Sequence, residues 1–278
     1  SYLCPLSLDQ ALDMLSQGNV SILAGGTDWF PMQGDLPLKR PVLDVTRLPG
    51  FRGITRQQGG WRIGAATRWS DVIRADLPPA FDGLKAAARE VGSVQIQNAG
   101  TVAGNLCNAS PAADGVPPLL TLDARVEMVS KAGTREVPLD QFLLGVRKTA
   151  LRAGELVSAV MVPEMEDGAR GAFLKLGARK YLVISIAMVA GVISLRDGRI
   201  FEARIAVGSC SPVAQRLRDL ETAMRGSTVA QALACVTPDH LTGLAPISDP
   251  RASAAYRLEA AAEACRRVVL STTEGVNA

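Results

Sequence analysis

The sequence predicts an α+β protein whose last part is an antiparallel sheet carrying helices. The dipeptide Asp197-Gly198 separates two apolar runs, residues 184–195 and 200–207, as in a β-hairpin. Residues 214–225 and 252–270 then have helical patterns. A length of 278 residues favours two domains, and 47% hydrophobic residues are enough to fill their cores.

The first 50 residues predict a small α/β unit. Ser7 and Gln10 match a capping box, and the apolar residues that follow share one helical face: Leu8, Ala11, Leu12 and Leu15. Short strands are expected at residues 20–24 and 42–45. Prolines 31, 37 and 41 argue against a long helix between these strands.

Between residues 61 and 162 the pattern predicts a mixture of strands, helices and one unusual loop. We expect strands at 61–67, 125–129 and 156–162, and helices from Ser70 and across 84–91. Residues 95–105 are small or carry amides, which indicates a loop. Residues 172–176 are expected to form a further strand.

Residues 163–171 contain acidic side chains and two glycines and are the best linker candidate. They divide an N-terminal domain, residues 1–165, from a C-terminal α+β domain, residues 166–278. The first domain is expected to have two subdomains, at about 1–50 and 51–165.

Composition disfavours several classes of protein. The net charge of +3 is spread along the chain without basic blocks, so no nucleic-acid partner is expected. The longest uncharged apolar run, residues 181–195, is too short to span a membrane. Five scattered cysteines without a CxxC pair indicate no zinc or iron–sulfur site. With no secretory signal at the first residues, we expect a reduced, cytoplasmic protein.

Two glycine-containing turns carry the strongest chemical signal. The first directly follows an apolar strand and consists of Ala24, Gly25, Gly26, Thr27 and Asp28. The second consists of Gly100, Thr101, Val102, Ala103, Gly104 and Asn105. Glycine lets the backbone approach a ligand closely and direct several N–H groups at one anion. A single turn of this kind is usually ordinary, but two of them next to strands predict a ligand with a diphosphate.

The common nucleotide motifs are missing from the sequence. It contains no GxxxxGK[ST] and no GxGxxG that opens a helix. The single histidine, His240, lies far from both turns, so no histidine base, catalytic triad or histidine metal site is expected near them. These observations favour a protein that binds a phosphate-bearing cofactor with its own reactivity.

These turns resemble a known family. Together with LCNASPAAD at residues 106–114 and FLKLGARK at residues 173–180, they resemble the FAD-binding medium subunits of the xanthine dehydrogenase and carbon monoxide dehydrogenase group. The resemblance covers nearly the whole chain, and the second turn with its extension is its most specific part. It implies a two-lobed FAD-binding domain of the vanillyl-alcohol oxidase type, followed by a C-terminal domain of the carbon monoxide dehydrogenase flavoprotein type.

The resemblance also implies roles for individual residues. The turns at 24–28 and 101–105 would hold the FAD pyrophosphate through backbone N–H groups, and Asp114 would bind the adenosine side. The chain departs from the family at Val102-Ala103, where Ile-Gly is common. Alanine restricts the backbone, so this turn must avoid a conformation open only to glycine.

Three further positions match the family's flavin region. Leu156 or Val157 would lie beside the flavin or the adenine, and Lys175 would contact the isoalloxazine region. Tyr181 has two interpretations. It either covers the flavin or is a core aromatic residue that opens a strand.

The function implied by the resemblance is electron transfer, with no catalytic residue supplied by this chain. FAD would be bound noncovalently, and a molybdenum-cofactor large subunit and a [2Fe-2S] small subunit would complete a dimer of heterotrimers. A self-contained flavin oxidase or dehydrogenase is the alternative, and a flavin-free interaction protein is disfavoured by the paired turns. The lack of a cysteine-rich insert disfavours the hydroxybenzoyl-CoA reductase branch. The hydroxylated substrate and the terminal electron acceptor stay open.

Overall fold

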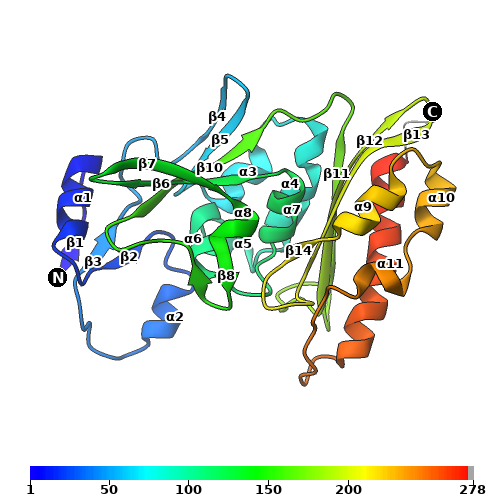
Figure 1. The fold of residues 1–278 in the computed structure, drawn as a ribbon. Helices are drawn as coiled ribbons and strands as arrows, with labels where there is room; N and C mark the ends of the chain where they lie inside the picture. Colours follow the sequence, from blue (N-terminus) through cyan, green and yellow to red (C-terminus); the bar gives the residue numbers. More distant parts are fainter. Residues whose placement is uncertain (275–278) are drawn as a thin grey trace.

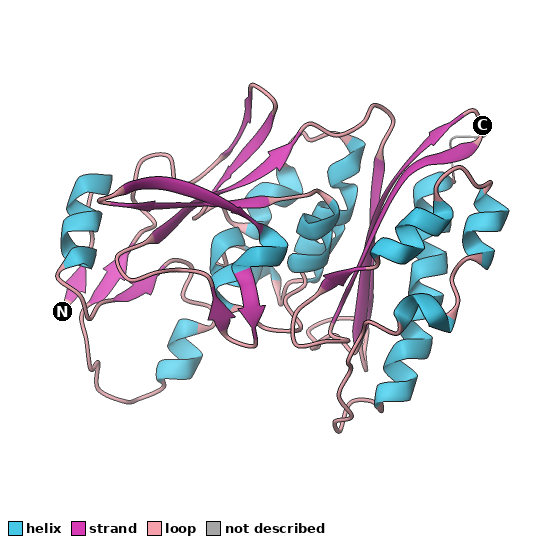
Figure 2. Ribbon diagram, viewed as in Figure 1, coloured by secondary structure: helices cyan, strands magenta, loops and turns pink. Residues whose placement is uncertain are grey.

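The computed structural model describes residues 1–274 and confirms the α+β class. Figure 1 shows three sheets in succession along the molecule: a small N-terminal sheet, a five-stranded central sheet and a four-stranded C-terminal sheet. Helices lie between the last two sheets and on the outer face of the last sheet (Figure 2). Within residues 1–274, no helix combines the length and apolar character needed to cross a membrane.

The N-terminal lobe contains a three-stranded parallel sheet in the order β1-β3-β2. The predicted opening helix is confirmed, because Ser7 Oγ accepts the Gln10 N–H at 3.3 Å and one apolar face is buried. The elements are β1 (Tyr2–Leu3), α1 (Leu8–Ser16), β2 (Ser21–Leu23), α2 (Trp29–Gln33) and β3 (Val42–Asp44).

The central sheet is antiparallel, with the order β4-β5-β10-β6-β7. Its strands are β4 (Ile54–Gln57), β5 (Gly60–Gly64), β6 (Arg125–Ser130), β7 (Gly133–Pro138) and β10 (Leu156–Pro163), and a separate hairpin is formed by β8 (Leu143–Gly145) and β9 (Lys148–Thr149). The helices are α3 (Trp69–Arg74), η1 (Pro79–Phe81), α4 (Asp82–Glu90), α5 (Val94–Gln97), α6 (Val102–Asn108), α7 (Val116–Thr121) and α8 (Leu139–Phe142).

Two sequence-based expectations for this region were wrong. Helix α3 begins at Trp69, so Ser70 is a buried helix residue and not its cap. The Asp71 carboxylate instead accepts the Arg68 backbone N–H at 3.1 Å. The loop expected at residues 95–105 is largely helical, because α5 and α6 occupy most of it. Ser93 and Thr101 cap these two short helices, a signal that the small residues between them obscured.

The C-terminal sheet has the order β11-β12-β13-β14 and is antiparallel throughout. Asp197 and Gly198 have φ values of 52° and 71°, which fits the predicted two-residue hairpin turn. Helix α11 covers one face, and α4 and α7 cover the other (Figure 1). The elements are β11 (Arg170–Leu176), β12 (Ala187–Arg196), β13 (Arg199–Gly208), β14 (Gln215–Arg216), α9 (Arg218–Met224), α10 (Val229–Ala234), η2 (Pro238–Leu241) and α11 (Ala254–Thr273).

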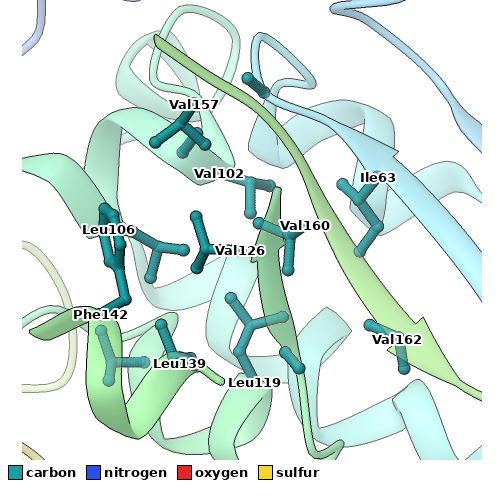
Figure 3. Close-up of a cluster of buried hydrophobic side chains, with 14 of the residues drawn as sticks. Ile63, Val102, Leu106, Leu119, Val126, Leu139, Phe142, Val157, Val160 and Val162 are labelled. Carbon is teal, nitrogen blue, oxygen red and sulfur yellow. The ribbon is translucent and has the colours of Figure 1, made fainter. Parts of the chain in front are cut away.

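Two hydrophobic clusters hold these layers together. The larger one fills the N-terminal and central regions, and Figure 3 shows Val102 and Leu106 of α6 within it, near Val157 and Val160 of β10. The smaller one packs α11 against the C-terminal sheet. The larger cluster also includes Val192 of β12, so the C-terminal sheet contributes to both clusters. The domain boundary at residue 165 stays a prediction.

Candidate functional site

The first glycine turn, residues 24–28, connects β2 to α2. Gly26 has a φ of +72°, and its carbonyl accepts the Phe30 N–H at 3.0 Å. An added Cβ on Gly26 would lie 2.6 Å from the Phe30 ring, so both conformation and space call for glycine. The backbone N–H groups of Gly25, Gly26, Thr27 and Asp28 donate to no carbonyl within residues 1–274. The turn therefore offers a run of available donors to an anion.

The second turn leads into α6, which includes its residues 102–105, so it follows a helix and not a strand, contrary to expectation. Thr101 Oγ1 accepts the Gly104 N–H at 3.1 Å and caps α6. The N–H groups of Val102 and Ala103 donate to carbonyls at 2.9 and 3.2 Å, and that of Asn105 donates to Thr101 O at 3.0 Å. Ala103 is helical and needs no glycine-only conformation. Of the backbone donors at 101–105, Thr101 is left with its N–H free within the described chain.

The two turns touch each other through their backbones. A Cβ added to Gly25 would lie 2.2 Å from Ala99 O and 2.8 Å from Gly100 Cα. A Cβ added to Gly100 would lie 3.4 Å from Thr27 Oγ1. Such close approach is open only to glycine at position 25, since real Cβ atoms do not come within 3.0 Å of another heavy atom. The available donors of the first turn are thereby held against the second turn.

Trp69 supports this contact, and the sequence analysis did not identify it. It is 1% exposed, and its backbone N–H donates to Gly100 O at 3.2 Å. On the other side of its ring, an added Cβ on Gly115 would lie 2.4 Å from Trp69 and 3.0 Å from Asn105 Oδ1. That Asn105 oxygen is buried without a hydrogen-bond partner.

Asp114 and Lys175 form a buried ion pair that joins the segment between α6 and α7 to strand β11 of the C-terminal sheet. Lys175 Nζ lies 2.7 Å from Asp114 Oδ2, and Ser185 Oγ donates to Asp114 Oδ1 at 2.7 Å. The two charged side chains are only 6% and 9% exposed. Burial raises the pKa of the Asp114 carboxyl, while the Lys175 ammonium group favours its ionised form. Lys175 also donates to Glu90 O at 3.3 Å, which ties β11 to the end of α4.

Three other residues named from the sequence are placed differently. Leu156 and Val157 lie in β10 with 1% and 7% exposure, within the larger hydrophobic cluster. Tyr181 is 60% exposed in the loop before β12, so its interpretation as a core aromatic residue was wrong. Lys180 Nζ lies 5.2 Å from the centre of the Tyr181 ring. Contact of Leu156, Val157 or Tyr181 with a cofactor stays a prediction.

Comparison with known proteins identifies relatives along the whole chain. Residues 1–165 match the family described as FAD binding domain in molybdopterin dehydrogenase, and residues 172–272 match the CO dehydrogenase flavoprotein C-terminal domain. The chain is 31% identical to the xanthine dehydrogenase FAD-binding subunit of Escherichia coli O157:H7, over 97% of this chain and 94% of that protein. It is 30% identical to the nicotine 6-hydroxylase medium subunit of Paenarthrobacter nicotinovorans, over 97% and 95%.

The fold leads to the same group. The structure of CO dehydrogenase from Oligotropha carboxidovorans matches with a TM-score of 0.90 and 26% identity, over 98% of this chain and 97% of that chain. The resemblance inferred from the two turns and their extensions is therefore confirmed. The chain belongs to the FAD-binding medium subunits of the xanthine dehydrogenase and carbon monoxide dehydrogenase family, and is an oxidoreductase subunit with FAD as its cofactor.

Proposed function

We propose that this FAD-binding subunit relays electrons from iron–sulfur clusters to a terminal acceptor within a molybdenum hydroxylase complex. The observation that carries the proposal is the close backbone approach of Gly25, in the first turn, to Ala99 and to Gly100 at the start of the second turn. At this contact the first turn has four consecutive N–H groups, at residues 25–28, that donate to no carbonyl within residues 1–274. Such a group of donors suits the pyrophosphate of FAD.

The residues around the turns also fit the cofactor. Asn105 has a buried side-chain oxygen without a hydrogen-bond partner within residues 1–274, and we assign it as an acceptor for a donor group of the ligand. The Asp114–Lys175 pair keeps a small exposed fraction, and we assign it to the edge of the site. We retain the roles that the family resemblance implies for three further residues. Leu156 or Val157 lies beside the flavin or the adenine, and Tyr181 covers the flavin.

When bound, FAD supplies the relay chemistry, because it accepts electrons singly and passes them on in pairs. The chain's own residues bind and orient the cofactor. No side chain of this subunit is assigned a catalytic role, and the partner subunits carry the molybdenum cofactor and the [2Fe-2S] clusters. We assign the complex two copies of each of three subunit types.

The purified chain is expected to hold FAD noncovalently. The turns provide hydrogen-bond donors, and His240 lies in η2, outside both turns. Acid precipitation should therefore release the flavin into the supernatant, where chromatography identifies it as FAD. Flavin that stayed in the pellet would contradict noncovalent binding, and FMN in the supernatant would contradict the pyrophosphate assignment.

The isolated chain is expected to oxidise none of the substrates used by the relatives' complexes. An assay with heterocycles, aldehydes and carbon monoxide, with a dye as electron acceptor, should give no turnover until the molybdenum and iron–sulfur subunits are added. Dye reduction by the chemically reduced chain serves as the positive control for bound FAD. Robust substrate turnover by the chain alone would favour a self-contained flavin oxidase or dehydrogenase instead.

A further inference from the structure

Three exposed apolar segments lie beside the candidate cofactor site, and we refer to them as the docking segments. They are residues 29–40, which include α2, residues 143–149, which form the β8–β9 hairpin, and residues 177–186, which connect β11 to β12. Each carries large apolar side chains that are more than half exposed, among them Met32, Leu36, Leu144, Val146, Tyr181 and Ile184. Clusters of this kind on a protein surface mark interaction sites.

Each docking segment is attached to a residue or helix of the candidate site. The Phe30 N–H donates to Gly26 O at 3.0 Å, and the Arg147 N–H donates to Ala109 O, just beyond α6, at 2.9 Å. Ser185 Oγ donates to Asp114 at 2.7 Å. In Figure 1, α2 and β8 lie along the lower edge of the molecule, as do the ends of β11 and β12 that the third segment connects. The docking segments therefore border the cofactor site.

The docking segments also share a charge pattern. Each contains one pair of adjacent exposed basic residues: Lys39-Arg40, Arg147-Lys148 and Arg179-Lys180. Their only acidic residue is Asp35. The whole chain has 30 basic and 27 acidic residues, so the rest of it has 24 and 26. The net positive charge of the protein thus resides on these segments.

None of these six basic side chains forms an ion pair within residues 1–274. By contrast, many other arginines of the chain are paired, including the exposed Arg56 and Arg218. Arg147 and Arg179 donate to backbone carbonyls, but these bonds leave the positive charges of the docking segments without an acidic partner in the described chain. Complementary charge steers association and selects among partners, while the apolar side chains supply contact area.

We infer that the docking segments together bind an acidic face of the iron–sulfur subunit that delivers electrons to the cofactor. This inference rests on the proposed function, because an electron donor must sit close to the flavin and the docking segments border its site. A membrane surface fits less well, since the apolar groups come from three separate elements and not from one amphipathic helix. Arginine and large apolar side chains are also the residues that protein interfaces favour.

The test uses the complex formed by co-expressing this chain with its molybdenum and iron–sulfur subunits. In the test variant, Arg147→Glu and Lys148→Glu reverse one basic pair. The matched control, Arg74→Glu with Arg225→Glu, reverses two exposed basic residues outside the docking segments that also form no ion pair within residues 1–274. We expect the test variant to bind the iron–sulfur subunit at least about tenfold more weakly. Its FAD content and melting temperature should equal those of the control.

Salt should weaken wild-type assembly and have less effect on the test variant, because the lost attraction is electrostatic. Assembly of the test variant as tight as that of the control would overturn the inference. Two other results would also overturn it. If the test variant lost only its binding to phosphatidylserine vesicles, the docking segments would bind a membrane. If it lost only self-association, they would bind a second copy of this chain. Flavin content is measured on the same samples. A wild-type complex without FAD would contradict the proposed function, whatever the result for the docking segments.

Discussion

Replacing Gly25 with alanine is expected to remove most of the bound FAD. The new methyl carbon would lie 2.2 Å from Ala99 O, a backbone atom that cannot rotate away. The two turns would have to separate, at a cost of about 1–3 kcal/mol for an overpacked contact. Because 1.4 kcal/mol corresponds to a factor of ten, a cost of this size lowers the affinity for FAD by about fivefold to 150-fold. The measurement is flavin absorbance per protein, followed by titration of the FAD-free variant with FAD.

Gly243→Ala is the matched control for this substitution. An added Cβ at Gly243 has no heavy atom within 4 Å, and Gly243 has no positive φ. The same chemical change should therefore leave FAD binding unaltered there. A folded Gly25→Ala protein with the flavin content of the control would show that the contact between the two turns does not shape the cofactor site.

Replacing Lys175 with methionine is expected to destabilise the protein strongly. The substitution leaves the Asp114 carboxylate, whose side chain is 9% exposed, without its cationic partner. Breaking a buried ion pair by removing one partner typically costs about 3–5 kcal/mol. The free energy of unfolding is measured in urea on FAD-free protein, so that lost cofactor binding does not contribute to the difference.

Two comparisons make this second prediction specific. Arg56→Met breaks the exposed pair with Glu164, whose side chains are 65% and 53% exposed, and should cost less than about 1 kcal/mol. Adding Asp114→Asn to Lys175→Met removes the isolated charge and should restore part of the lost stability. Equal losses for Lys175→Met and Arg56→Met would show that the burial of the Asp114–Lys175 pair does not raise the cost of breaking it.

The sequence predicted features that depend on neighbouring residues. The opening helix follows from Ser7 and its apolar spacing, and the hairpin at Asp197 and Gly198 follows from the left-handed conformation that these two residue types tolerate. The two turns and their extensions were sufficient to indicate the family. Each of these signals lies within a few residues of the structure that it specifies.

Other elements exist only because distant parts of the chain pair with them. The two residues of β14 are a strand because they bond to β13, which shortened the helix expected at residues 214–225. Strand β4 likewise depends on its pairing with β5. Neither strand has a periodic pattern long enough to distinguish it from a turn or a helix. The tendency of a segment to form a strand depends on what its side chains pack against.

The tertiary structure decided the geometry of the candidate site. The sequence contained both turns, but most of the second turn's backbone donors bond to the carbonyls of Thr67 and Ala65 or to Thr101. Gly25 brings the free donors of the first turn close to the second turn. The Asp114–Lys175 pair joins residues 61 positions apart. Sequence patterns report which groups are present, whereas hydrogen-bond saturation and burial depend on contacts between distant segments, and these become fixed only when the chain has folded.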